Sequence, residues 1–257
     1  MPMKIAAYQF AVSSDIRKNM TAIENAVREA KSRGVELLVF PECALTGYPP
    51  RDLASSKDVD RSAVKEACKA FSKLSDETGV AFVVGLIEED HGRIYNRASC
   101  FIPGKKRVNY DKRALWGWDR DNFAMGEKDG IFTYKGFKIG MRICFEVRFP
   151  EYFRELYRRK TDLDIVLFYD VTDADDPDRY YMISGHLQTR AVENVCPILS
   201  ANTIAPNQTA PTVLFGKSGQ KLIEAERGRE GLIEYDLPKT EDNFGEKGRR
   251  EISDLLI

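Results

Sequence analysis

Short apolar runs alternate along this chain with longer amphipathic segments. The apolar runs have the length and composition of strands buried on both faces of a sheet; they occupy 35–40, 80–86 and 164–169. The amphipathic segments place apolar residues at helical spacing; they occupy 16–33, 62–78 and 179–195. Extended segments that flank short turns predict hairpins; they are 80–86 with 94–101, and 131–134 with 137–144. This order predicts an α/β fold in which helices cover mixed sheets.

The charge balance excludes several classes of protein. The chain has 257 residues, and 39 Lys and Arg stand against 40 Asp and Glu, which leaves a formal net charge of −1. A basic surface for nucleic acid or for a membrane is not expected from such a balance. The apolar runs are also far shorter than the roughly 20 residues that cross a bilayer, and the first residues lack the pattern of a secretory signal. We therefore expect neither nucleic acid nor a membrane as a partner.

The length and composition favour one domain over 1–257. About 250 residues can surround a single core in an α/β fold, and 43% hydrophobic residues are enough to fill it. The stretch 239–257 is polar and then apolar, so we expect a C-terminal tail that packs on another surface. The five cysteines are scattered and form no CxxC pair, so neither disulfides nor a zinc site is expected. This cysteine usage fits a reducing cytoplasm.

Three polar residues lie close to the ends of expected strands. Glu42 comes directly after an apolar run, at the strand end where α/β sheets place their ligands. Cys144 lies between an expected strand and an expected helix at 150–159, a junction that can expose a nucleophile and lower the pKa of its thiol. Lys112 follows a further extended segment. Taken singly, each has an ordinary alternative: a solvated carboxylate, a small buried side chain and a surface lysine.

The order and spacing of these residues resemble the nitrilase superfamily of carbon–nitrogen hydrolases. Three motifs carry the resemblance: FPE at 40–42, CFEVRFPE at 144–151, and TRAVEN at 189–194 with Ser-Ala-Asn at 200–202. They are similar to the glutamate, nucleophile and helix motifs of that family and occur in the same order. The resemblance covers nearly the whole chain. It implies a four-layer α-β-β-α sandwich, no metal or organic cofactor, and assembly as a homo-oligomer.

The resemblance also implies a Glu-Lys-Cys triad. Glu42 would be the general base, Lys112 the stabilising cation and Cys144 the nucleophile, with the backbone N–H of Phe145 as a second oxyanion donor. These residue types suit amide hydrolysis, because a thiolate must attack the carbonyl, a base must move protons, and positive charge must meet the oxyanion. Many family members have a second glutamate between the lysine and the cysteine. That position is Asp119 here, a carboxylate with a shorter reach.

Aromatic and acidic residues in loops are candidates for substrate contact. Tyr48, Trp116 and Trp118 could line a pocket, or could equally pack in the core or at a dimer surface. An acidic loop at 170–178 contains five aspartates and lacks the register of a calcium loop. Through Asp170 or Asp173 it would favour substrates with a positively charged amine, although a solvated loop is the ordinary interpretation of a run of charges.

The leading functional hypothesis is hydrolysis of a small amide to a carboxylic acid and ammonia through a thioester at Cys144. Hydrolysis of N-carbamoyl amines uses the same triad and stays open. True nitrile hydrolysis is disfavoured, because nitrilases usually have CWE where this chain has CFE. A catalytically silent binding or assembly member also stays open, because Asp119 and Ile183 replace a Glu and a Trp that are common in the family. The segment PECALTGYPPRDL at 41–53 also resembles the glutaminase domain of NAD synthetases.

Overall fold

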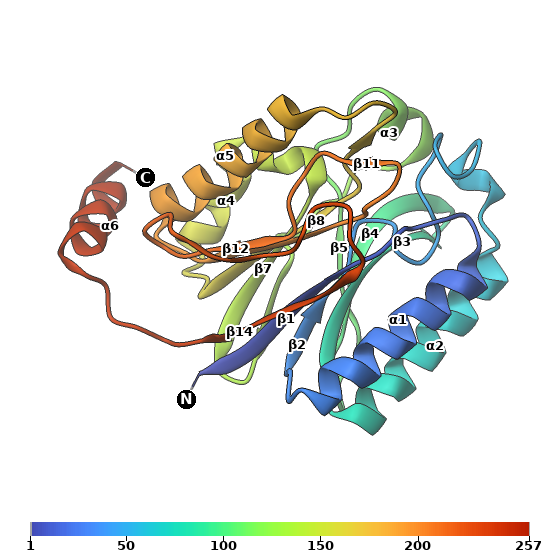
Figure 1. Ribbon diagram of the computed structural model, residues 1–257, viewed down its shortest axis with the longest axis horizontal. Helices are drawn as coiled ribbons and strands as arrows, with labels where there is room; N and C mark the ends of the chain where they lie inside the picture. The colour runs from blue at the N-terminus through green and yellow to red at the C-terminus, as the bar shows by residue number, and fades with distance from the viewer. Residues whose placement is uncertain (1, 257) are drawn as a thin grey trace.

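Two six-stranded sheets lie face to face between two pairs of helices (Figure 1). The computed structural model describes residues 2–256. Helices α1 and α2 cover the outer face of one sheet, and α4 and α5 cover the outer face of the other. The four-layer α-β-β-α sandwich expected from the sequence is confirmed.

The first sheet has the strand order β14-β1-β2-β3-β4-β5. Its elements are β1 (Met3–Gln9), β2 (Leu37–Val39), β3 (Ala81–Asp90), β4 (Arg93–Phe101), β5 (Val108–Asp111) and β14 (Gly231–Leu237), with α1 (Ile16–Ser32) and α2 (Arg61–Thr78). Strands β1, β2 and β3 are parallel, and the others join antiparallel. Asp15 and Asp60 accept hydrogen bonds from the first turns of α1 and α2, which fixes where these helices begin.

The second sheet has the order β13-β12-β10-β8-β7-β6. Its elements are β6 (Ile131–Tyr134), β7 (Phe137–Ile143), β8 (Leu163–Phe168), β10 (Ile198–Asn202), β12 (Val213–Phe215) and β13 (Lys221–Glu224), with α4 (Pro150–Arg158) and α5 (Pro177–Asn194). Strands β7, β8 and β10 are parallel. Short elements that the sequence analysis did not anticipate complete the loops; they are α3 (Trp118–Asn122), η1 (Ser56–Asp58), η2 (Cys144–Arg148), β9 (Val171–Thr172) and β11 (Asn207–Gln208).

Alternate residues of the central strands fill separate apolar layers. In β8, Ile165 and Leu167 belong to the cluster between the two sheets, whereas Val166 and Phe168 belong to the cluster beneath α4 and α5. Both faces of the strand are therefore buried, which is why its sequence is almost continuously apolar. Asp164 is the one charged residue of this strand, and it is fully buried like its neighbours.

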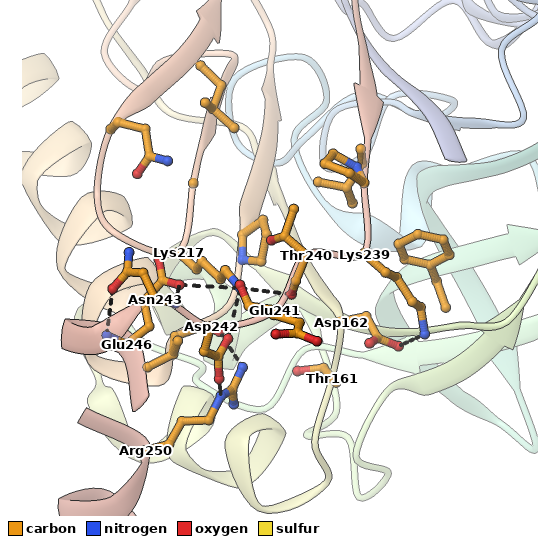
Figure 2. Close-up of a pocket in the computed structure, with 18 of the residues that line it drawn as sticks. Thr161, Asp162, Lys217, Lys239, Thr240, Glu241, Asp242, Asn243, Glu246 and Arg250 are labelled. Carbon is orange, nitrogen blue, oxygen red and sulfur yellow. Dashed lines mark hydrogen bonds and ion pairs between the residues drawn. The ribbon is translucent and has the colours of Figure 1, made fainter. Parts of the chain in front are cut away.

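The C-terminal segment, expected as a tail that packs on another surface, contains a helix. Helix α6 (Phe244–Leu256) stands apart from the sandwich in Figure 1. Charged contacts attach its start to the body: Figure 2 shows Lys217 between Asp242 and Glu246, and Arg250 against Asp242. Its large apolar side chains are mostly exposed; they are Phe244, Ile252, Leu255 and Leu256. Ile257, the last residue of the expected tail, lies outside the described residues.

Among residues 2–256, every helix is too short or too polar to span a bilayer.

Candidate active site

Glu42 lies in a loop that passes directly against β3. The approach requires Gly85, because a Cβ there would lie 2.4 Å from the carbonyl oxygen of Pro41 and from the backbone nitrogen of Cys43. Backbone hydrogen bonds close the contact: Gly85 N donates to Pro41 O (3.1 Å), and Leu45 N donates to Gly85 O (3.0 Å). The glycine of the apolar run at 80–86 therefore determines where the carboxylate lies.

Three donors hold the buried carboxylate of Glu42. Its Oε1 accepts from Lys112 Nζ (2.8 Å) and Asn96 Nδ2 (2.6 Å), and its Oε2 accepts from the backbone N–H of Tyr169 (2.8 Å). Burial raises the pKa of Glu42, and the positive charge of Lys112 does not cancel that effect. The sequence analysis missed Asn96, although asparagine is depleted in strands and its position within β4 is a usable signal.

Lys112 follows β5 and is enclosed by two carboxylates. Its Nζ lies 2.8 Å from Glu42 Oε1 and 2.7 Å from Asp119 Oδ2. Burial alone would lower the pKa of Lys112, but the charges of Glu42 and Asp119 outweigh burial and raise it well above its usual value. The lysine is therefore a permanent cation. Tyr48 donates its hydroxyl to Asp119 Oδ1 (2.7 Å), so the shorter carboxylate still reaches the lysine from the first turn of α3.

Cys144 lies where β7 ends and η2 begins. Its φ of 46° is left-handed, a conformation that costs a non-glycine residue energy and is concentrated at functional sites. Of the five cysteines, all within the described residues, Cys144 alone is not fully buried. Burial and the negative charge of Glu42 raise the pKa of its thiol well above the usual value. The expected lowering of that pKa was wrong: α4 begins only at Pro150, and Glu42 dominates the local field.

A second buried carboxylate joins the cysteine turn to the lysine loop. Glu146 Oε2 accepts from the backbone N–H of Ile143 (2.7 Å), and Oε1 accepts from Tyr110 Oη (2.7 Å) and Arg113 N (2.8 Å). Because Arg113 follows Lys112 directly, Glu146 sets the position of the nucleophile relative to the cation. The sequence analysis assigned Glu146 no role, although an acid two residues after the candidate nucleophile was visible in the CFE motif.

A cavity of about 320 Å³ opens at Cys144. It is lined by Lys112, Asp119 and five of the residues expected to contact substrate, which are Tyr48, Trp116, Trp118, Phe145 and Asp170. Asp173, the other candidate of the acidic loop, is not among the lining residues. Tyr48 stacks on Tyr169 with 5.1 Å between ring centroids. Ile183 also lines the cavity, so the replacement of the tryptophan common in the family changes the cavity wall. The candidate residues therefore lie at one site.

The aspartates from which a preference for cationic substrates was expected are paired with arginines. Asp170 is buried and receives Nε and Nη2 of Arg179, each at 2.7 Å. Asp173 pairs with Arg51 at 2.8 Å, so arginines neutralise these aspartates of the acidic loop. Arg148 also lines the cavity, lies 5.4 Å from the ring centroid of Phe145, and has no carboxylate partner within residues 2–256. None of the three arginines was identified from the sequence.

The chain belongs to the carbon–nitrogen hydrolase family, whose model matches residues 4–241. Its fold is similar to that of an amidase from Nesterenkonia sp., with a TM-score of 0.81 and 26% identity over 99% of this chain and 96% of that one. Another structure of the Nesterenkonia amidase has the acetamide moiety of fluoroacetamide added covalently at its active site cysteine. The chain is thus a hydrolase of the nitrilase superfamily, of amidase-like type, that acts on C–N bonds.

Two curated relatives differ in how much of their length this chain spans. It is 26% identical over 232 residues to an omega-amidase of Danio rerio. The aligned region covers 84% of this chain and 79% of the relative. It is 27% identical over 170 residues to a glutamine-dependent NAD(+) synthetase of Acinetobacter baylyi. That aligned region covers 64% of this chain and 31% of the relative. The chain therefore spans about a third of the synthetase.

Proposed function

We propose that the chain hydrolyses a small-molecule amide to a carboxylic acid and ammonia through a thioester at Cys144. One observation carries this proposal: Lys112 is enclosed by Glu42 and Asp119 and lines the same cavity as the least buried thiol of the chain. An amide carbonyl is a weak electrophile, so it needs a nucleophile, a base and a cation at one place.

In the first half-reaction Glu42 accepts the thiol proton of Cys144, and Sγ attacks the carbonyl carbon. The tetrahedral oxyanion lies between Lys112 Nζ and the backbone N–H of Phe145. When the oxyanion collapses, the C–N bond breaks, and the proton on Glu42 passes to the leaving ammonia. The raised pKa of Glu42 supports this role, because a carboxylate of ordinary pKa would be a weak base toward a thiol.

In the second half-reaction Glu42 accepts a proton from water as the water oxygen attacks the thioester carbon. The C–S bond breaks, the acid leaves, and the proton returns from Glu42 to Sγ of Cys144. Asp119 does not take part in these transfers. It holds Lys112 in position, and Tyr48 holds Asp119 in turn.

Two alternatives remain to be separated by experiment: hydrolysis of N-carbamoyl amines and a silent binding role. A panel of simple amides and N-carbamoyl amines is incubated with the wild type, Cys144→Ala and the matched control Cys68→Ala, and ammonia is measured. We expect release from amides by the wild type and the control only, with an acyl adduct on Cys144 detected by intact mass. Release from N-carbamoyl amines alone supports the first alternative, and no release from any compound supports the second.

The partners and compartment are part of the proposal. The exposed apolar residues of α6 support assembly as a homo-oligomer, which sedimentation of the purified chain tests. Five free cysteines support a reducing, cytoplasmic compartment. The balanced charge supports a small molecule, rather than nucleic acid or a membrane, as the ligand.

A further inference from the structure

A second, apolar groove adjoins the cavity at Cys144. Its volume is about 770 Å³, and it shares two lining residues, Trp116 and Phe145, with the catalytic cavity. The argument below concerns six of its residues, which we call the aromatic groove; they are Leu115, Trp116, Met125, Phe145, Phe149 and Tyr152.

The aromatic groove keeps large apolar side chains in contact with solvent. Trp116 is 66% exposed, Met125 63% and Phe149 38%. Single exposed apolar residues are ordinary, but apolar residues gathered around a hollow mark a binding surface. Three charged residues also line the groove. Arg113 pairs with Glu155, Arg120 donates to the carbonyl oxygen of Leu115 (3.2 Å), and Glu151 is exposed to solvent. The groove is therefore suited to an apolar occupant.

Contacts between rings connect the groove to the nucleophile. Phe145 follows Cys144 directly, and its ring meets Phe149 edge to face with 5.1 Å between centroids. Phe149 meets Tyr152 in the same way at 6.3 Å. A row of rings thus leads from the cysteine turn into the groove. The catalytic cavity differs from the groove in that charged side chains surround Cys144 in addition to aromatic ones; they include Lys112, Asp119 and Arg148.

We propose that the aromatic groove is a subsite for the acyl portion of the substrate, and that the preferred substrates are amides whose acyl chain ends in an aromatic or branched aliphatic group. This inference rests on the proposed function, because the amide carbon must lie at Cys144 for the far end of the acyl chain to reach the groove. The catalytic cavity takes the amide, and the groove removes the apolar end from water.

The first test compares acetamide with 3-phenylpropionamide. We expect the wild type to favour the phenyl amide in kcat/KM by about 10-fold or more, the scale on which an apolar pocket discriminates. Met125→Ala should reduce that preference several-fold. Met182→Ala is the matched control, since Met182 is also exposed (42%), lies on α5 and lines neither cavity. An unchanged preference in Met125→Ala, with the fold verified by circular dichroism, overturns the proposal.

A second test measures binding without turnover. The chain has two tryptophans; Trp116 and Trp118 both line the catalytic cavity, and Trp116 also lines the groove. Tryptophan fluorescence of Cys144→Ala should therefore change saturably with 3-phenylpropionamide and much less with acetamide, and adding Met125→Ala should weaken the response. Equal responses to both amides contradict the subsite. Because the readout needs no catalysis, it separates failure of the subsite from failure of the proposed hydrolysis.

The competing occupant is a second copy of this chain. Sedimentation equilibrium of the wild type, Met125→Ala and Phe149→Leu should give the same oligomeric state, and Phe149→Leu replaces Met125→Ala if the latter does not fold. If either variant dissociates an oligomer and leaves the ratio of the two kcat/KM values unchanged, the groove is an interface between copies and the proposal is overturned.

Discussion

The floor and the mouth of the candidate site differ in how firmly they are held. The floor consists of Glu42, Lys112, Asp119 and Cys144, where the three charged side chains are at most 6% exposed and bonded to one another or to buried groups. The mouth consists of Trp116, Trp118, Met125 and Arg148, and the first three are 59–66% exposed. The contacts of the floor fix the positions of its reactive groups, whereas the mouth can change without disturbing them. The difference separates reaction type from substrate choice.

The physical reason lies in the cost of buried charge. Removing one partner of a buried ion pair leaves an uncompensated charge and costs about 3–5 kcal/mol, whereas an exposed side chain contributes about 1 kcal/mol or less. Substitutions in the floor should therefore affect stability and turnover together, unless the residue is uncharged. Substitutions in the mouth should affect kcat/KM alone.

The largest effect is expected from Cys144→Ala. Without a thiol no covalent intermediate forms, so turnover of any amide substrate should fall below detection. Because Cys144 makes no ion pair, the free energy of unfolding should stay close to that of the wild type. Activity assays and urea denaturation measure the two quantities. Turnover near that of the wild type would remove Cys144 from the mechanism.

Lys112→Ala should reduce both the turnover and the free energy of unfolding. The loss of one oxyanion donor lowers kcat by about 10²- to 10³-fold, and the unpaired carboxylates of Glu42 and Asp119 lower the free energy of unfolding by about 3–5 kcal/mol. Lys73→Ala is the control, because the side chain of Lys73 is 78% exposed. A change confined to KM would make Lys112 a substrate-binding residue instead.

Asp164 tests what burial costs a carboxyl that its neighbours compensate only in part. Neither oxygen has a hydrogen bond of good geometry within residues 2–256. Burial raises its pKa to about 7, against the smaller lowering effects of Thr161 and Arg142. Because the folded pKa lies above the unfolded value of about 3.9, this group's contribution to stability is complete below pH 4 and is lost as pH rises to 7. The loss amounts to about 4 kcal/mol.

Asp164→Asn should remove that part of the pH dependence, measured as the free energy of unfolding between pH 4.5 and 8. Asp236→Asn, an exposed strand aspartate of β14, is the control. A pH profile of Asp164→Asn identical to that of the wild type would mean that the carboxyl is not strained by burial.

Glu146→Gln should have a smaller effect on stability and a distinct effect on catalysis. The amide nitrogen of Gln cannot accept a hydrogen bond, so at least one donor among Ile143 N, Tyr110 Oη and Arg113 N loses its partner. The cost of such a buried group is about 1–3 kcal/mol. We expect kcat to fall more than KM rises, because the nucleophile shifts relative to the cation. The control is the exposed Glu127→Gln, and equal effects of the two substitutions on kcat would exclude a positioning role.

The smallest effect is expected from Arg148→Gln in the mouth. Its unpaired guanidinium should favour an amide that carries a carboxylate, such as succinamate, over one that carries an amine, such as β-alaninamide. Loss of one partly exposed pairing should reduce that preference by about two- to fivefold, with the free energy of unfolding unchanged. Arg158→Gln, also exposed, should alter neither. A preference for the amine-bearing amide in the wild type would reverse our assignment of the cavity charge.

The sequence predicted the layers and the candidate floor because both are encoded in short segments. The almost continuously apolar composition of 164–169 predicts a buried strand, and the motifs FPE and CFEVRFPE each place one reactive group at a strand end. No short sequence motif specifies the side-chain contacts of the mouth. Arg179 neutralises Asp170 only because the loop between them folds back, and no local pattern specifies that path.

The pKa of Cys144 shows the same limit. A local argument from a helix N-terminus gave the wrong direction, because burial and, after it, the negative charge of Glu42 raise the pKa of this thiol. Glu42 follows a strand of the other sheet. The hydrogen bond from the backbone N–H of Tyr169 that orients the Glu42 carboxylate joins residues 127 apart in the sequence. Helix α6 was missed for a different reason: Gly245 and Gly248 lower its helical propensity.

Strand β1 begins the chain, yet β14 supplies one of its two neighbours in the first sheet, with Met3 opposite Leu237. Tyr8 likewise donates its hydroxyl to Glu230 across 222 residues. During synthesis this edge of β1 must therefore stay unpaired until β14 has left the ribosome. An open strand edge is a template for pairing with other chains, and contacts this distant in sequence form slowly. The closure of β14 on β1 is thus a late step in folding, and the emerging chain is most exposed to aggregation before it.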